Sequence, residues 1–376
     1  MVTKWRHRYQ SRQIIAGWIA RFSTEALGYN RTVTDGFATP EGTARLAARF
    51  PTFSDSGFYR KVDLLDISSL GLGTYLGEAD NQTDVAYHDA AIAAVRGGIN
   101  FLDAAINYRH QRSERSISAA LTELFRSGPA RRDEVVIATK AGFLTPGAVP
   151  AFLKDGDVVG NMHSMQPDFL ADQIERSRAN LGLGTIDIFY LHNPETQLGF
   201  ISREEFDNRI RLAFLKLEQM VAEAKIRNYG TATWDGYRRP AGARDALNLE
   251  RLLEIATEAG GSSHHFRFIQ LPFNLAMPEA FTNGVLELAA KSGIAVVASA
   301  TLLQARLARD LPQALAEKLP GFSTDAQRAI QFTRSTPGIA AALVGMSQAA
   351  HVAENLAVAG MPRLTAEAYE DLYQRA

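Results

Sequence analysis

The chain has 376 residues, of which 46% are hydrophobic, and it carries 40 Lys and Arg residues against 41 Asp and Glu residues. This near-neutral charge excludes the broad basic surface that binds nucleic acid. Cysteine is absent, which excludes disulfides, thiolate catalysis and cysteine-ligated metals. No apolar run reaches the roughly 20 residues of a membrane span, so we expect a cytoplasmic globular protein with no integral membrane segment.

Residues 1–57 are expected to form an N-terminal extension, either poorly ordered or lying on the surface as an arm. The first 30 residues are rich in arginine, and Glu25 is their single acid. An organelle transit peptide, an interfacial helix and translation from an upstream start codon all fit this pattern, whereas a secretory signal does not. Residues 31–57 read as a linker with a helical piece at 43–49. Since this extension supplies no strand, its deletion is expected to leave the remaining domain folded.

Strand and helix signals alternate from residue 58 to the end of the chain. A hairpin is expected from residues 58–61 and 64–67. The predicted strands follow at 70–74, 99–103, 135–140, 186–192, 227–231, 266–271, 294–299 and 341–344. Helices are predicted after them at 84–96, 114–125, 169–181, 204–224, 247–259, 284–292, 324–335 and 348–359, with a last helix at 365–374.

Eight such strand and helix units predict an α/β fold, a (β/α)8 TIM barrel over residues 58–376 with an N-terminal extension and hairpin and extra C-terminal helices. The alternative is an open Rossmann-like sheet. It is disfavoured because Gly71 and Gly73 end the first strand without the third glycine of a dinucleotide-binding turn.

Four ionisable side chains are predicted to share the mouth of this barrel, where the carboxyl ends of the strands meet. Asp103, Lys140 and His192 end three consecutive strands, and Tyr108 follows the first of them by five residues. Each residue alone is more often a turn residue, a solvated lysine, rim packing or a core histidine. Their coincidence at one end of the barrel favours a functional site.

The charges of these groups suit carbonyl reduction. A buried Asp103 needs a cation, which Lys140 would supply, and Asp103 in turn would keep Lys140 protonated. We expect the Lys140 ammonium to lower the pKa of Tyr108 and a neutral His192 to donate an N–H to a substrate oxygen. Such a set can protonate a carbonyl oxygen that gains negative charge. No nucleophilic Ser–His–acid arrangement and no pair of histidines with metal-ligand spacing is visible, so no metal is expected.

The chain resembles the aldo-keto reductase family, from about residue 70 to residue 359. The motifs that carry the resemblance lie at residues 101–108, 113–114, 136–140, 187–192, 225–230, 269–274 and 351–355. The resemblance implies that Asp103, Tyr108, Lys140 and His192 form the catalytic tetrad, with Tyr108 as the proton donor. It also implies a nicotinamide cofactor, NADP or NAD, held across the mouth of the barrel.

The resemblance further implies a set of cofactor-binding residues: Gly73, Thr74, Asp103, Thr233, Gln270, Ser299, Gly345, Ser347, His351, Glu354 and Asn355. Two positions depart from the family's pattern. Ala232 and Thr233 replace a Ser-Asn pair, and Ser299 replaces an aromatic residue that stacks on the nicotinamide. Weaker or differently posed cofactor binding is therefore expected. Only His351 could offer charge to a 2′-phosphate, so both cofactors stay open.

The expected function is an NAD(P)(H)-dependent oxidoreductase acting on an aldehyde, a ketone, or the corresponding alcohol or sugar. One alternative is a cofactor-binding barrel that serves as a non-catalytic or weakly catalytic regulatory subunit. Another is a Schiff-base lyase with Lys140 as nucleophile. The expected partner is a small-molecule substrate, and the oligomeric state is not predicted. The long loop at 141–165 is either a surface insertion or a lid, and Trp234 and residues 301–321 are other candidate pocket walls.

Overall fold

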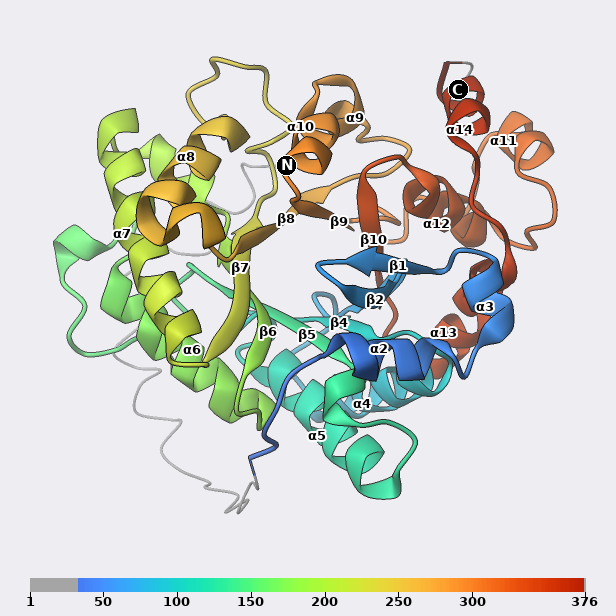
Figure 1. The fold of residues 1–376 in the computed structure, drawn as a ribbon, viewed down its shortest axis with the longest axis horizontal. Helices are drawn as coiled ribbons and strands as arrows, with labels where there is room; N and C mark the ends of the chain where they lie inside the picture. The colour runs from blue at the N-terminus through green and yellow to red at the C-terminus, as the bar shows by residue number, and fades with distance from the viewer. Residues whose placement is uncertain (1–32, 375–376) are drawn as a thin grey trace. The chain divides into compact units, whose positions relative to one another are not determined.

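The computed structural model describes residues 33–374, and from Val33 onward the chain forms one compact unit. Eight parallel strands close a barrel in the order β10-β3-β4-β5-β6-β7-β8-β9 (Figure 1). The strands are β3 (Leu70–Gly73), β4 (Phe101–Asp103), β5 (Val136–Ala141), β6 (Ile186–His192), β7 (Ile226–Ala232), β8 (Phe266–Pro272), β9 (Ala295–Ser299) and β10 (Ile339–Gly345). The predicted TIM barrel is confirmed, and the open sheet is excluded because the sheet is closed.

Helices alternate with the strands, as the sequence predicts. They are α4 (Asn81–Arg96), α5 (Arg112–Ser127), α6 (Pro167–Leu181), α7 (Arg203–Ala222), α8 (Leu249–Gly260), α10 (Val285–Lys291), α12 (Asp325–Ser335) and α13 (Ala349–Asn355). Local chemistry sets where several begin: the side chains of Asp80, Ser202 and Thr324 each accept a hydrogen bond from a backbone N–H of the first helical turn. Between Val33 and Gln374, no helix combines the length and the hydropathy of a membrane span.

Shorter elements fill the connections. They are the helices α2 (Pro40–Ala47), α3 (Pro51–Asp55), α9 (Glu279–Thr282), α11 (Gln313–Lys318) and α14 (Ala366–Gln374), and the 3-10 helices η2 (Arg132–Glu134), η3 (Asp155–Asp157), η4 (Pro194–Gly199), η5 (Gly261–Ser263) and η6 (Leu356–Gly360). Apart from α14 and part of α2, these elements are too short for a sequence period to reveal them.

The barrel is a packed core rather than a pore. Every residue of β5 and β6 is buried, because parallel strands of such a barrel are covered on both faces. The side chains that fill the interior include Phe101, Val136, Ala138, Ile188, Tyr190, Phe268, Val297 and Leu343. This filling leaves only the carboxyl ends of the strands for chemistry.

An antiparallel hairpin, β1 (Tyr59–Val62) and β2 (Leu65–Ser68), confirms the predicted hairpin. Its side chains Val62, Leu65 and Ile67 pack against the interior of the barrel. The hairpin runs directly into the start of β3, so it covers the end at which the strands begin. We call this end the floor, and the opposite end the mouth.

Residues 33–57 form hydrogen bonds with the barrel and the hairpin, whereas the sequence predicted a linker or a surface arm. The backbone N–H of Ala38 donates to Asp187 Oδ1 at 2.7 Å, and Thr43 Oγ1 accepts from the backbone N–H of Asp66 at 3.0 Å. These bonds fasten the segment around α2 to β6 and to the hairpin at the floor. Deleting residues 1–57 is therefore expected to destabilise the barrel, contrary to the expectation from the sequence. The Arg-rich start of the chain lies outside the described residues.

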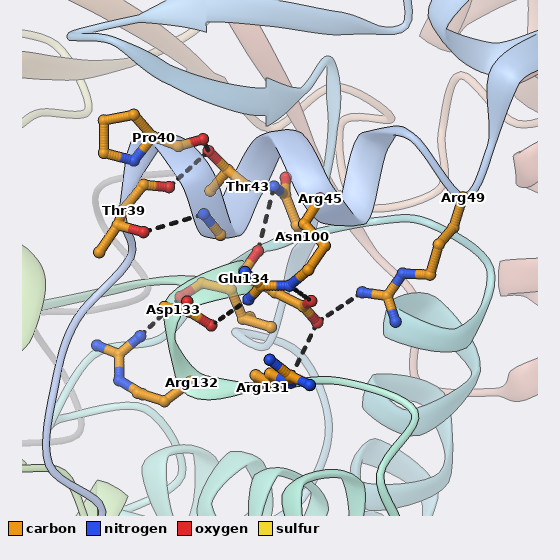
Figure 2. Close-up of polar contacts among 12 residues, drawn as sticks. Thr39, Pro40, Thr43, Arg45, Arg49, Asn100, Arg131, Arg132, Asp133 and Glu134 are labelled. Carbon is orange, nitrogen blue, oxygen red and sulfur yellow. Dashed lines mark hydrogen bonds and ion pairs between the residues drawn. The ribbon is translucent and has the colours of Figure 1, made fainter.

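Helix α2 also neutralises a buried acid at the floor. Glu134 is 2% exposed, and its two carboxylate oxygens accept from Arg45 Nε at 2.7 Å and Arg49 Nη2 at 2.5 Å. The backbone N–H of Arg131 adds a third bond at 2.9 Å (Figure 2). Both arginines come from the segment around α2, which explains why this short helix packs where it does.

Candidate active site

The mouth of the barrel brings three of the four predicted catalytic side chains to adjacent strands. Asp103 ends β4, Lys140 lies one residue before the end of β5, and His192 ends β6; these strands are neighbours in the barrel. Tyr108 lies in the turn after β4, where its backbone N–H donates to Ala105 O at 3.0 Å. The predicted constellation therefore forms at one end of the barrel.

Lys140 and Asp103 form a buried ion pair. Lys140 Nζ donates to Asp103 Oδ1 at 2.5 Å and to Ala104 O at 2.6 Å, and the lysine is fully buried. Gln270 Nε2 donates to the other oxygen, Asp103 Oδ2, at 2.9 Å. Burial lowers the pKa of Lys140, and the charge of Asp103 opposes this shift. Asp103 thus favours the ammonium form of Lys140, as expected from the sequence.

The pKa of Tyr108 differs from the one expected from the sequence. The pKa of its phenol is raised well above 10, first by burial and then by the Asp103 carboxylate. Lys140 Nζ lies 4.8 Å from the centroid of the Tyr108 ring, but its charge is already met by Asp103. The expected lowering of the Tyr108 pKa in the resting site is therefore wrong. Among the described residues, the Tyr108 hydroxyl has no hydrogen-bond partner and is free to meet a ligand.

His192 is a neutral imidazole, as expected. Burial, followed by the positive charge of Lys140, lowers its pKa well below 6.5. Its Nδ1 lies 3.1 Å from Asn107 Oδ1, and its ring lies 5.7 Å from that of Tyr108. Asn107 sets the tautomer: with its carbonyl oxygen toward Nδ1 the proton sits on Nδ1, whereas with its amide nitrogen there the proton sits on Nε2. Donation to a carbonyl oxygen from Nε2 requires the second orientation.

His163 is a buried residue beside the candidate site that sequence reasoning missed. Its Nε2 lies 2.7 Å from the backbone oxygen of His192, and Gln197 Nε2 donates to its Nδ1 at 3.2 Å. Burial lowers the pKa of His163 to about 4, so the ring is neutral and carries its proton on Nε2. The ring of Phe143 packs edge-on against both imidazoles, at 5.2 Å from His163 and 5.3 Å from His192.

The stem of the long loop at 141–165 therefore holds the backbone of His192 in place. Glycine is required at position 142, because a Cβ there would lie 2.5 Å from His163 Nε2 and 2.6 Å from His192 O. No spacing in the sequence connects His163 with His192, which explains why the contact was not predicted. The tip of this loop exposes Val149, Phe152 and Met162.

Glu195 is a second buried group that the sequence did not reveal. Its Oε1 accepts from the backbone N–H groups of Trp234, Asp235 and Gly236 at 2.9, 3.2 and 3.4 Å. Burial raises the pKa of Glu195 to about 7 despite these bonds. The side chain thereby joins the segment after β6 to the turn after β7. It fixes the backbone of Trp234, a predicted pocket wall whose side chain is 41% exposed.

The expected cofactor-binding residues follow the remaining strands around the mouth. Gly73 pairs with Gly345 across β3 and β10, and Ser299 pairs with Pro272 across β9 and β8. The other positions are Thr74 after β3, Thr233 after β7, Gln270 on β8, Ser347 after β10, and His351, Glu354 and Asn355 on α13. The tetrad and the positions at the strand ends therefore lie around the same mouth, whereas His351, Glu354 and Asn355 lie further along the chain on α13.

Buried polar atoms without partners mark where a polar ligand fits. Within the described part of the chain, Thr233 Oγ1, Thr301 Oγ1 and Asn355 Oδ1 are buried and lack a hydrogen-bond partner. Thr233 directly follows β7 and Thr301 follows β9, so both lie at the mouth, whereas Asn355 is the last residue of α13. Thr74 differs, because its hydroxyl donates to Asp103 O at 2.9 Å. Across residues 33–374, no group of His, Asp and Glu side chains could hold a metal ion.

The family model for "Aldo/keto reductase family" matches residues 69–374. The "NADH-specific methylglyoxal reductase" of Escherichia coli (strain K12) is 28% identical over 179 residues, which cover 46% of this chain and only 50% of that protein. The "6-dehydroglucose reductase" of Novosphingobium aromaticivorans is 26% identical over 274 residues, covering 70% of this chain and 76% of that protein.

Solved structures share the fold at low identity. An aldo/keto reductase from Klebsiella pneumoniae in complex with NADP and acetate has a TM-score of 0.61 at 21% identity, covering 85% of this chain and 94% of that one. The holo form of an aldo-keto reductase from Bacillus halodurans also has a TM-score of 0.61, at 20% identity, covering 85% and 96%. The chain thus belongs to the aldo/keto reductase family and is an oxidoreductase of that type.

Proposed function

We propose that the protein reduces an aldehyde or ketone, or oxidises the corresponding alcohol or sugar, with NADP or NAD as cofactor and Tyr108 as the proton donor. The observation that carries this proposal is the grouping of Asp103, Tyr108, Lys140 and His192 at one mouth, with the Tyr108 hydroxyl unengaged. Two relatives named as reductases of methylglyoxal and of 6-dehydroglucose support a small carbonyl substrate.

The raised pKa of Tyr108 keeps the phenol protonated at rest. The proton moves from Tyr108 Oη to the substrate oxygen only when that oxygen becomes more basic than the phenolate, which happens as the carbonyl gains negative charge. The ammonium of Lys140, 4.8 Å from the ring centroid, then stabilises the phenolate. Lys140 thus acts on the product of proton transfer rather than on the resting phenol.

His192 and Asp103 support this transfer in different ways. With the proton on Nε2, the neutral His192 hydrogen-bonds the substrate oxygen beside Tyr108 and orients the carbonyl. The bond between His163 and the backbone of His192 fixes where that imidazole lies. Asp103 keeps Lys140 charged and, through Gln270, connects the tetrad to β8.

A nicotinamide bound in the mouth would supply or accept the hydride. Thr233 and Gln270 are proposed to hold its carboxamide end, because Thr233 Oγ1 is buried without a partner and Gln270 retains a free carbonyl oxygen. Asn355 and Thr301 are proposed to hold the rest of the dinucleotide. His351 is exposed on α13 and is the residue there that could meet a 2′-phosphate.

The structure does not favour a Schiff-base lyase. Lys140 is fully buried, its Nζ donates to both Asp103 and Ala104, and the Tyr108 ring covers it. A substrate carbonyl could not reach this nitrogen without breaking the ion pair. The regulatory alternative rests on Thr233 and Ser299, the departures from the family's pattern, and a kinetic experiment separates it from catalysis.

The test is nicotinamide absorbance with NADH and with NADPH across a panel of aldehydes and ketones, including methylglyoxal. Tyr108→Phe is expected to lower kcat by about 10²- to 10⁴-fold, the usual contribution of a positioned general acid. Quenching of tryptophan fluorescence should show that the variant still binds the cofactor. Tyr59→Phe is the matched control, because it removes a hydroxyl that donates to Gly98 O at the floor, and its kcat should not change.

Two outcomes would contradict the proposal. If Tyr108→Phe turned over as fast as the unaltered protein, Tyr108 would not be the donor. If the protein bound the cofactor but reduced none of the carbonyls, with or without the substitution, the regulatory interpretation would be favoured instead.

A further inference from the structure

Three arginines meet near the floor of the barrel, away from the site at the mouth. Arg60 lies on β1, Arg334 on the last turn of α12, and Arg363 between η6 and α14. Arg60 Nη2 donates to the backbone oxygen of Arg334, and Arg334 Nη1 donates to Met361 O at 3.1 Å. A Cβ built on Gly57 would lie 3.9 Å from Arg363 Cδ. Gly57 therefore lies near the Arg363 side chain, and Arg60 bonds the backbone of Arg334.

Each of the three guanidinium groups has a buried N–H without an acceptor. The atoms are Arg60 Nε, Arg334 Nη2 and Arg363 Nε. In the part of the chain that the structure describes, none of the three forms an ion pair with a carboxylate, unlike Arg132, which bonds Asp187. An unsatisfied buried donor destabilises a fold. Arg112, Arg132 and Arg328 also leave a buried Nε unpaired, but each of them forms an ion pair with a carboxylate. The three arginines near the floor combine an unpaired N–H with the lack of such a partner among the described residues, which favours an acceptor from outside the chain.

Oxygens of the chain accept hydrogen bonds from only some of the N–H groups of Arg334. Arg334 Nε donates to Ser69 Oγ at 3.1 Å, and its Nη1 also donates to Gln331 Oε1 at 2.7 Å and Val358 O at 3.1 Å. These bonds use two of the three guanidinium nitrogens and leave Nη2 unpaired. Among the described residues, Arg334 thus has neither a carboxylate partner nor an acceptor for Nη2.

The charges of the cluster repel one another. The pKa of Arg60 is lowered well below its usual value, first by burial and then by the charges of Arg363 and Arg334. Burial and then Arg363 lower the pKa of Arg334 to about 9. No acid opposes either shift. A fully buried arginine such as Arg334 normally has an anionic partner.

We propose that Arg60, Arg334 and Arg363 bind a small inorganic oxyanion, phosphate or sulfate. The planar donors of arginine match the oxygens of such an ion, and one ion could accept from several of the unpaired N–H groups. Its negative charge would also remove the repulsion within the cluster. Arg334 Nε bonds Ser69, the residue before β3, so the site lies at the floor and is separate from the mouth and its cofactor.

The test measures thermal unfolding of the full chain in HEPES and sodium gluconate at constant ionic strength, with added sodium phosphate or sodium sulfate at low millimolar concentration. The unaltered protein should show a saturable rise in Tm, and calorimetric titration should find one anion per chain. Arg363→Gln is the main variant, because its side chain is half-buried and the variant should fold. It should weaken anion binding at least tenfold, and Arg60→Gln should do the same.

The test includes a matched control, and the stability difference between Arg363→Gln and the unaltered protein should change sign when oxyanion is added. Arg126→Gln removes the same charge from an exposed arginine of α5 and should keep the full response. Without oxyanion, Arg363→Gln should be at least as stable as the unaltered protein, because repulsion falls; with saturating phosphate, the order should reverse.

Two results would overturn the proposal. One is a loss of stability in Arg363→Gln that is equal with and without phosphate, which would show a structural arginine. The other is an unsaturated rise in Tm that is the same in all proteins, which would show a general salt effect. The readout does not depend on turnover, so it is independent of the proposed reductase activity.

Discussion

The two ends of the barrel each contain a buried ion pair, but the two pairs have different surroundings. At the floor, Arg132 Nη2 donates to Asp187 Oδ2 at 2.8 Å, and the backbone N–H groups of Ala38 and Ile137 fill the remaining positions of the carboxylate at 2.7 and 2.8 Å. The guanidinium also donates to two backbone oxygens. The carboxylate at the floor is therefore satisfied within the chain.

At the mouth, the Lys140–Asp103 pair lies among groups that lack partners. The hydroxyl of Tyr108 has none among the described residues, and Thr233 Oγ1 is buried and unpaired. The floor carboxylate thus bonds only to groups of the chain, whereas the mouth pair lies in the proposed active site. The two pairs therefore differ in whether a reactive hydroxyl without a partner, that of Tyr108, lies beside them.

The largest effect is expected from Asp187→Asn at the floor. The change leaves the Arg132 guanidinium buried and charged at neutral pH, because a guanidinium is much more basic than an amine. The free energy of unfolding should fall by about 3–5 kcal/mol, as is usual when one partner of a buried pair is removed. Chemical denaturation measures this loss, and kcat per folded molecule should be unchanged. A loss of turnover without a loss of stability would contradict the assignment of this pair to the fold.

The second prediction concerns two buried groups beside the mouth with opposite pH dependence. Glu195 has its pKa raised from 4.5 to about 7, so the folded state binds the proton more tightly and stability falls as pH rises through this window. His163 has its pKa lowered from 6.5 to about 4, so the unfolded state binds this proton more tightly. The contribution of His163 to stability therefore rises as pH rises from about 4 to 6.5. Each shift corresponds to about 3 kcal/mol at 1.36 kcal/mol per pH unit. Between pH 4.5 and 6.5 the two contributions nearly cancel.

Single substitutions should reveal each contribution separately. Relative to the unaltered protein, Glu195→Gln should lose stability as pH falls from 6.5 to 4.5, because only His163 then titrates. His163→Gln should gain stability over the same change. Unfolding by urea at several pH values measures both slopes. Parallel slopes in all three proteins would show that these residues do not titrate in this range.

The fold was largely predictable because its signal is periodic. Eight apolar runs, each followed by an amphipathic stretch, specify strands and helices locally, and the hairpin before them was also predicted correctly. The role of residues 33–57 was not predictable. Helix α2 is held by Arg45 and Arg49 on Glu134, an acid 89 residues from Arg45 in the chain, and such a contact has no local signature.

The placement of the tetrad was predictable because strand ends determine which side chains share the mouth. The pKa of Tyr108 was not, since it depends on burial and on how much of the Lys140 charge Asp103 already meets. The supporting residues His163 and Glu195 were also missed. Each binds backbone groups of a segment that only the folded barrel brings near.

The effect that becomes smallest at high pH is expected from Asp103→Asn at the mouth, although this change removes the same charge as Asp187→Asn. Lys140, unlike Arg132, can lose its proton, and burial already lowers its pKa. The loss of stability at pH 7 therefore has an upper limit of roughly 4–5 kcal/mol, the cost of deprotonating a lysine with a usual pKa of about 10.4 at 1.36 kcal/mol per pH unit. It should shrink as pH rises toward 10, because the unfolded lysine then loses its proton as well, whereas the deficit of Asp187→Asn should stay constant. Equal deficits at pH 7 and pH 10 would show that Lys140 stays charged without Asp103.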